Sequence, residues 1–305
     1  MIKGESFLFS RSHGLDLQPQ QDMKLVRCHW LCLLLLSFCL LIWYNHMTRF
    51  GFVIKRGLRG YMRVPSSSYA SSYSLKFHCG SCAIVSSSGQ MLGGGRGQEI
   101  DRQDCVIRMN AAPTVGYEAD VGSKTSLRVV SHTSVPHLVR KQGFFFEKEA
   151  DTRYVVWGPE INMRQDGKGK VFNMLVKLAR AYPHTQIYYV TREKVQYCDD
   201  VFQNETGKNR MKSGAYLSTG FFTLILAMEA CDSTLVYGMI DGSYCSQPNR
   251  SSVPYHYYEV SRLDECRMYH AHEHAKRAGH RFITEKEIYR RWASQGKLHF
   301  IYPSW

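Results

Sequence analysis

Short apolar runs alternate with amphipathic segments along most of the chain, and this alternation predicts strands and helices in turn. Segments of three to five mostly apolar residues predict strands, at 83–85, 105–109, 126–130, 153–157, 186–190, 234–237 and 298–301. Apolar residues that recur every three or four positions predict helices, at 172–179, 221–230 and 285–292. Strands that alternate with helices favour an α/β fold with a mostly parallel central sheet and helices on both faces.

Polar residues and glycines follow three of these predicted strands. They are residues 86–89, Asn110 and Gly238. Because ligands of parallel sheets bind outside the carboxyl ends of the strands, we expect these loops to contact a ligand.

A longer apolar segment precedes the alternating region. Residues 28–44 are apolar apart from His29 and Ser37, and about 17 residues is near the lower limit for a membrane-spanning helix. Small residues of the kind that signal peptidase needs do not follow it. We therefore predict a cytoplasmic tail at 1–27, a transmembrane signal anchor at 28–45, a serine-rich stem at 46–77 and a lumenal domain at 78–305.

The orientation of this predicted anchor depends on opposing signals. Basic residues are more numerous after the segment than just before it, which by itself favours a cytosolic C-terminal side. Asn204 and Asn249 begin glycosylation acceptor patterns, and seven cysteines lie beyond the segment, which favours an oxidising compartment. We interpret the C-terminal side as lumenal.

Net charge and composition limit the classes of binding partner. The chain has 305 residues, 44% of them hydrophobic, and a formal net charge of +13. A basic surface attracts polyanions, but no basic run with interleaved aromatic residues and no zinc-finger spacing indicates nucleic acid. A nucleotide-sugar donor or an acidic glycan also fits a positive surface.

Two histidines in short motifs rich in polar and aromatic residues are the candidate catalytic residues. His256 lies within the stretch 255–259, His280 is followed by Glu285, and both come after a Ser-Thr-Gly turn at 218–220. Imidazole can accept a proton from a sugar hydroxyl near neutral pH. The sequence contains no Asp-x-Asp, with which many sugar transferases hold a divalent cation. A nucleoside monophosphate leaving group, stabilised by hydrogen bonds and one imidazole, needs no metal.

Two other motifs suggest different chemistry. The glycine-rich loop 93–97 lacks both the dinucleotide spacing and a Gly-Lys-Ser/Thr ending, so we interpret it as a flexible turn. His270 and His274 would share one helix face, as zinc ligands do, with His272 between them. No third ligand is evident, and we favour a polar helix over a zinc hydrolase site.

Four stretches, in this order, resemble the long, short, third and very short motifs of animal sialyltransferases. They cover much of 82–122, then 213–239, 255–259 and 280–285. Residues 129–136, 205–208 and 272–274 further resemble the alpha-N-acetylgalactosaminide alpha-2,6-sialyltransferases, in particular the third and fourth types. Two positions depart from the usual pattern, since Ser87 stands where relatives often have asparagine and Phe221 where they usually have tryptophan.

The resemblance implies a single Rossmann-like domain of the GT-A-variant kind in a type II Golgi membrane enzyme. It implies CMP-sialic acid as donor, no cofactor and no metal, and inverting transfer to O6 of GalNAc in sialyl-α2,3-galactosyl-β1,3-GalNAc of O-glycans or gangliosides. His280 would be the general base, and His256 would steady the phosphate of the leaving CMP. The implied nucleotide contacts are Ser87, Asn110, Tyr216, Ser218, Thr219 and Gly220.

The resemblance also implies a disulfide between Cys82 and Cys231. Cys245–Cys266 and Cys79–Cys105 are further expected pairs, which leave Cys198 free. A competing hypothesis is a non-catalytic lumenal glycan-binding protein on the same scaffold. Such a protein would be expected to have lost the two histidines, and both are present.

Overall fold

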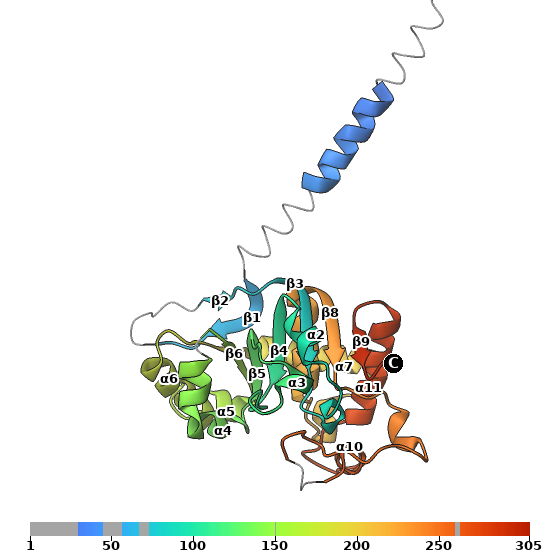
Figure 1. The fold of residues 1–305 in the computed structure, drawn as a ribbon. Helices are drawn as coiled ribbons and strands as arrows, with labels where there is room; N and C mark the ends of the chain where they lie inside the picture. Colours follow the sequence, from blue (N-terminus) through green and yellow to red (C-terminus); the bar gives the residue numbers. More distant parts are fainter. Residues whose placement is uncertain (1–29, 45–56, 67–72, 150, 260–262) are drawn as a thin grey trace, which may run out of the picture. The chain divides into compact units, whose positions relative to one another are not determined.

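One sheet organises the fold. The computed structural model describes residues 30–44, 57–66, 73–149, 151–259 and 263–305, and within these residues nine strands pair in the order β2-β1-β7-β6-β5-β4-β3-β8-β9 (Figure 1). All pairs from β7 to β9 are parallel. These strands are β3 (Cys79–Val85), β4 (Cys105–Met109), β5 (Leu127–Ser131), β6 (Arg153–Trp157), β7 (Gln186–Val190), β8 (Cys231–Tyr237) and β9 (His299–Tyr302). The predicted mostly parallel sheet is confirmed.

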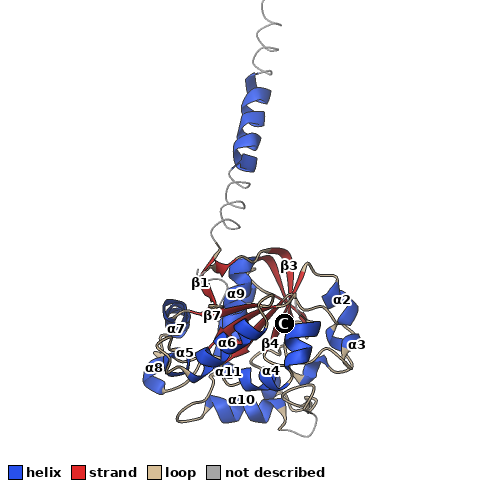
Figure 2. Cartoon of the chain, turned by 90° about the vertical axis from the view of Figure 1, so that its left-hand side faces the viewer, coloured by secondary structure: helices blue, strands red, loops and turns tan. Residues whose placement is uncertain are grey.

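Helices cover both faces of this sheet (Figure 2). Successive side chains of a strand point to opposite faces, so Ile84 packs in the cluster with α7, α9 and α11, whereas Ala83 packs with α2 and α3. Further along the sheet, α4 and α6 cover this second face. The bounds are α2 (Gly97–Asp101), α3 (Glu118–Val121), α4 (Val135–Arg140), α6 (Lys170–Ala181), α7 (Arg192–Thr206), α9 (Thr219–Ala230) and α11 (Phe282–Ser294).

Helix α7 was not predicted from the sequence. Val195, Cys198 and Phe202 form its apolar stripe at helical spacing and pack into the core. Charged and polar residues occupy most of the other positions, so the stripe is too narrow to be evident without its packing partner.

The folded part begins earlier than the predicted boundary at residue 78. Strands β1 (Leu58–Arg63) and β2 (Ser74–Leu75) lie within the predicted stem 46–77, yet β1 pairs antiparallel with β7 and β2 pairs with β1. Leu58, Tyr61 and Val64 are buried, which is the physical reason that this segment joins the sheet. Basic residues and glycine lie between the apolar residues of β1, so the sequence pattern did not predict a strand there. The predicted tail at 1–27 and the stem residues 46–56 and 67–72 lie outside the described residues.

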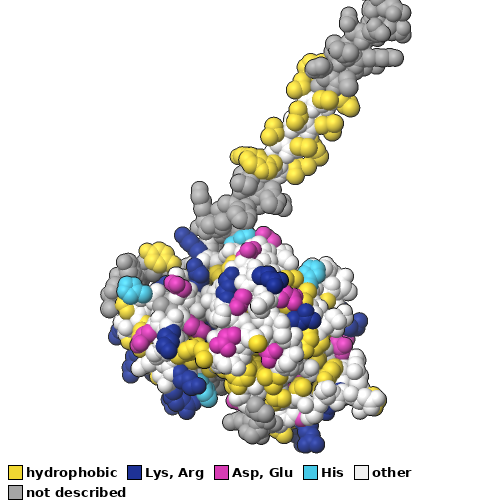
Figure 3. Space-filling model, in the orientation of Figure 1, with side chains coloured by type: hydrophobic (Ala, Val, Ile, Leu, Met, Phe, Trp, Pro, Cys, Tyr) yellow, Lys and Arg dark blue, Asp and Glu magenta, His cyan; other side chains and the backbone are white. Residues whose placement is uncertain are grey.

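Residues 30–44 form a helix in a unit separate from the unit that contains the sheet. Its large apolar side chains, such as Trp30, Leu36 and Trp43, are exposed, and hydrophobic side chains line its visible surface (Figure 3). No helix in the described ranges combines the length and apolar content needed to cross a bilayer. Residues 28, 29 and 45 of the predicted anchor lie outside those ranges.

Three disulfides cross-link the described part of the chain, and one of them fastens its carboxyl half to the centre of the sheet. Cys82–Cys231 joins β3 to the start of β8, and Cys79–Cys105 joins β3 to β4. Cys245–Cys266 is also present, so all three expected pairs are confirmed. Cys198 is free and buried, and burial raises the pKa of its thiol to about 12, which keeps it protonated and unreactive.

Candidate functional site

The loops that follow β3 and β8 meet at the carboxyl edge of the sheet, together with the segment that contains His256. The backbone N–H of Tyr257 donates to the carbonyl of Ser87 at 2.8 Å, and that of Gly89 donates to Pro254 at 2.9 Å. A Cβ on Gly89 would lie 2.4 Å from the Pro254 carbonyl oxygen. Glycine is therefore required for this close approach. As a result, Ser87 lies opposite Tyr257, the residue that follows His256.

Asn110 joins the ends of two neighbouring strands. It follows β4 directly and adopts a left-handed conformation, with φ of 50°, which asparagine tolerates better than most residues. Its Oδ1 accepts a hydrogen bond from the backbone N–H of Ser131 at 2.9 Å, at the end of β5. The predicted ligand residue is thus held rigidly at the carboxyl edge.

The Ser-Thr-Gly turn begins helix α9. Ser218 is the N-cap residue, and its Oγ accepts from the backbone N–H of Phe221 at 3.1 Å. The N–H groups of Thr219 and Gly220 lie in the first turn, where backbone donors have no acceptor within the helix. Such a terminus favours an anion such as phosphate.

Glu285 supports this turn from the neighbouring helix α11. Its carboxylate accepts hydrogen bonds from the backbone N–H of Ser218 at 2.8 Å, from the Ser218 hydroxyl, and from Tyr289 at 2.9 Å. Burial raises the pKa of Glu285 to about 7, against the opposing effect of these hydrogen bonds. The Ser218 hydroxyl already has protein partners on both sides, so the structure uses it to shape the turn.

His280 lies directly before α11, beside Tyr216. Its Nδ1 is 3.0 Å from the backbone carbonyl oxygen of Tyr216. A carbonyl oxygen can only accept, so Nδ1 carries the hydrogen and Nε2 has the lone pair. Burial lowers the pKa of His280 below its usual value, and His272 contributes to the same effect. The half-buried ring is therefore neutral at pH 7 and able to accept a proton.

His256 makes the corresponding contact with a carboxylate. Its Nδ1 is 2.9 Å from Oε2 of Glu259, which leaves Nε2 for another partner. The ring stacks on Tyr258 with the centroids 5.1 Å apart and the planes 9° apart. This fixes the orientation of the imidazole.

An aromatic cluster connects the two histidines. Tyr255 contacts His256 at a ring-centroid distance of 4.4 Å, and Phe282 contacts His280 at 5.2 Å. Tyr255 and Phe282 are themselves 6.0 Å apart. The structure thus brings the third and very short motifs together, although their histidines are separated by 23 intervening residues in the sequence.

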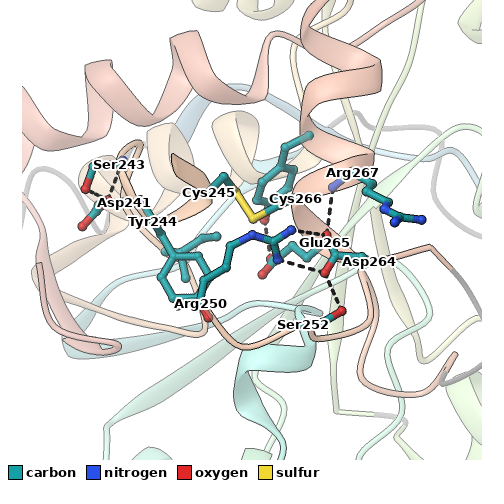
Figure 4. Close-up of a disulfide and its surroundings, with 12 residues drawn as sticks. Asp241, Ser243, Tyr244, Cys245, Arg250, Ser252, Asp264, Glu265, Cys266 and Arg267 are labelled. Carbon is teal, nitrogen blue, oxygen red and sulfur yellow. Dashed lines mark hydrogen bonds and ion pairs between the residues drawn. A yellow bond between two sulfur atoms is a disulfide. The ribbon is translucent and has the colours of Figure 1, made fainter. Parts of the chain in front are cut away.

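The loop that leads to His256 is cross-linked at its base (Figure 4). Cys245–Cys266 fastens it to α10 (Glu265–Glu273). Arg250 pairs with Asp264 at 3.0 Å, and Ser252 donates to the same carboxylate at 2.7 Å. These hydrogen bonds, with that of Arg267, lower the pKa of Asp264 to about 2 against the opposing effect of its burial.

A cavity of about 1050 Å³ opens beside Tyr216, at the ends of β6 and β7. Trp157 and Leu217 line it as well, and the Trp157 indole N–H donates to Thr219 at 3.3 Å. His280, His256 and Asn110 are not among its lining residues. The cavity borders the histidine site at Tyr216 and Leu217 and the Ser-Thr-Gly turn at Trp157, and it offers space for a saccharide there.

The other motifs singled out in the sequence have different environments. The backbone N–H groups of Gly93 and Gly95 donate to the carboxylate of Asp120, both at 2.9 Å, so the glycine-rich loop is closed by the protein itself. His270 stacks on His274, whereas His272 stacks on His280. The described residues contain no group of three histidine, cysteine or acidic side chains placed to hold a metal. Asn204 and Asn249 are both exposed.

Sequence reasoning assigned no function to two positions that contact the site, His272 and Trp157. His272 was considered as a possible metal ligand, because of its spacing from His270 and His274, and as part of the stretch 272–274 that resembles the subgroup, but neither interpretation gave it a contact with His280. Trp157 ends a predicted strand, and its place at the carboxyl edge of the sheet was a usable signal.

Comparisons with known proteins agree with these motifs. The sequence model of glycosyltransferase family 29 (sialyltransferase) matches residues 41–297. A human protein named alpha-N-acetyl-neuraminyl-2,3-beta-galactosyl-1,3-N-acetyl-galactosaminide alpha-2,6-sialyltransferase is 56% identical over 74% of this chain and 75% of its own. Human alpha-N-acetylgalactosaminide alpha-2,6-sialyltransferase 3 is 51% identical over 84% of this chain and 83% of its own. The crystal structure of a mammalian sialyltransferase aligns at 23% identity and a TM-score of 0.49, over 75% of this chain and 70% of that chain.

Proposed function

This chain belongs to glycosyltransferase family 29, the sialyltransferases, and we propose that it transfers sialic acid from CMP-sialic acid to O6 of GalNAc. The proposed acceptor is sialyl-α2,3-galactosyl-β1,3-GalNAc of O-glycans or gangliosides. Two observations from the comparisons carry the proposal. The region matched by the family includes both histidines and the Ser-Thr-Gly turn, and relatives more than half identical to this chain are named for this linkage.

The donor binds at the carboxyl edge of the sheet in this proposal. The N–H groups of Thr219 and Gly220 face the phosphate of CMP, because a helix N-terminus favours an anion. Nε2 of His256 reaches the same phosphate, since Glu259 occupies its Nδ1. Ser87, Asn110 and Tyr216 border the nucleotide.

The transfer step uses His280 as general base. Nε2 of His280 takes the proton of the acceptor hydroxyl, and the oxygen forms a bond to the anomeric carbon of sialic acid. The bond from that carbon to the phosphate oxygen breaks on the opposite face, and its electron pair leaves with CMP. The configuration is therefore inverted. The acceptor saccharide enters from the cavity beside Tyr216.

The reaction needs no divalent cation in this scheme, because CMP leaves with a single phosphate rather than a pyrophosphate. An assay of the full chain with CMP-sialic acid and sialyl-α2,3-galactosyl-β1,3-GalNAc, in excess chelator, should give a disialylated product with the new linkage at O6 of GalNAc. Loss of turnover in chelator that is restored by a cation would contradict metal independence. Binding of the acceptor without any turnover would instead support the non-catalytic glycan-binding hypothesis.

The proposed location is the Golgi membrane, with a type II orientation and the 28–45 segment as signal anchor. The sequon asparagines and the three disulfides support a lumenal domain. A Rossmann-like domain of the GT-A-variant kind belongs to the same proposal.

This topology predicts that Asn204 and Asn249 carry N-glycans in cells. Each asparagine is exposed, so the transferase that adds the glycan can reach it. Removal with an endoglycosidase should increase the gel mobility of the wild-type chain and leave an N204Q/N249Q chain unchanged. A wild-type chain that does not shift would argue against the lumenal orientation.

A further inference from the structure

We propose that His272 is a positioning residue for His280, which holds both the ring and the backbone of the proposed base. The inference rests on the proposed function, because it concerns the residue that would take the acceptor proton. It assigns to His272 a task distinct from metal binding.

Two contacts connect the histidines. The imidazole rings stack with their centroids 5.3 Å apart and their planes 7° apart. The backbone N–H of His280 also donates to Nδ1 of His272 at 3.3 Å. A ring nitrogen that accepts carries no hydrogen, so His272 has its hydrogen on Nε2. His280 is the opposite tautomer, because its Nδ1 donates to Tyr216.

His272 lies in the last turn of α10, and this turn is fastened to the start of α11. Arg281 donates to the carbonyl oxygens of His272 and Ala275, each at 2.9 Å. Glu273 accepts from the backbone N–H of Ile283 at 2.8 Å and from the Thr284 hydroxyl at 2.6 Å. The end of α10 and the start of α11 are therefore clamped together without a ligand, and a side chain on this clamp can preorganise the base.

The hydrogen bond to His280 exists only while His272 is neutral. A proton on its Nδ1 would remove the acceptor and place a positive charge against the stacked ring of His280. Two other charged groups lie near the His272 ring. The Arg281 guanidinium donates to the His272 carbonyl oxygen, and the Glu273 carboxylate accepts from Thr284 of α11. Phe282 is an apolar ring in contact with His272. Burial lowers the pKa of His272, which keeps the ring neutral at pH 7. His270 and His274, on the same part of the chain, stack on each other.

Activity should therefore be lost on protonation of either histidine of the stack. For the wild-type enzyme this predicts an acid limb of kcat/KM whose logarithmic slope steepens from about one toward two as both rings take up protons. A proton on His280 removes the lone pair that accepts the acceptor proton. A proton on His272 breaks the hydrogen bond that positions His280.

Two variants separate the contacts. H272F keeps a ring for stacking but removes the acceptor, and we expect kcat to fall about 10- to 100-fold with little change in KM for the donor. H272N places a side-chain oxygen where Nδ1 was, so it should recover most of that loss. Because asparagine does not titrate, the acid limb of H272N should have a slope of about one. H270N changes an exposed histidine of the same helix and should behave as wild type.

A measurement that needs no turnover tests the geometry itself. The full chain, labelled with ¹⁵N at its histidines and studied in detergent by NMR, should show His272 protonated at Nε2 and His280 at Nδ1. Full activity of H272F with an unchanged acid limb would overturn the inference, and so would hydrogen on Nδ1 of His272. If the protein showed these tautomers but did not use CMP-sialic acid, the proposed function would be wrong. The positioning of His280 by His272 would still hold.

Discussion

Replacement of His280 by alanine should lower kcat for sialic acid transfer by about 10²- to 10⁴-fold, the usual contribution of a general base. The variant loses the only group that, in our proposal, takes the acceptor proton. CMP binding should change little, because the proposed phosphate contacts come from α9 and His256. Single-turnover kinetics measure the chemical step, and calorimetric titration with CMP measures binding.

The pH dependence of the wild-type enzyme belongs to the same prediction. A protonated ring cannot accept a hydrogen, so activity should fall as pH decreases through the pKa of His280. Burial lowers that pKa from its ordinary value of 6.5, so the acid limb of kcat/KM should lie below pH 6.5. H299A, which truncates an exposed histidine of β9, is the matched control. Normal turnover by H280A would show that another group is the base.

Replacement of Cys82 and Cys231 by alanine should have the largest effect on stability. The two cysteines are 149 residues apart, and cross-linking so long a loop removes enough chain entropy from the unfolded state to stabilise the fold by about 5 kcal/mol. The Cys245–Cys266 pair is separated by 21 residues, and the same relation gives about 3 kcal/mol. Domains are stable by only about 5–15 kcal/mol, so C82A/C231A should be close to unfolding at body temperature.

Denaturant unfolding of the two double variants, compared with wild type, tests this order. The C82A/C231A protein retains Cys79–Cys105, which still holds β3 to β4. C198A is the control for loss of a buried thiol without loss of a cross-link, and it should cost about 1 kcal/mol. If C245A/C266A were the less stable double variant, loop length would not be the dominant effect.

Most of the central sheet could be predicted from the sequence because its strands are buried on both faces. Such strands appear as short, mostly apolar segments, and 105–109 and 153–157 coincide with β4 and β6. Strand β1 differs, since glycine and arginine interrupt its buried positions. Only pairing with β7 shows that it belongs to the sheet.

The sequence by itself determined the parallel sheet, the motifs that indicate a sialyltransferase, and His280 and His256 as the candidate groups. These follow from local periodicity and from short motifs, which neighbouring residues specify. Only the tertiary structure decided what those groups contact. Tyr216 sets the tautomer of His280 from 64 residues away, and Glu285 holds the Ser218 turn from 67 residues away. Spacing along the chain made His272 a possible metal ligand, whereas the structure shows that it contacts His280. The orientation of a helix depends on its packing, which residue spacing does not encode.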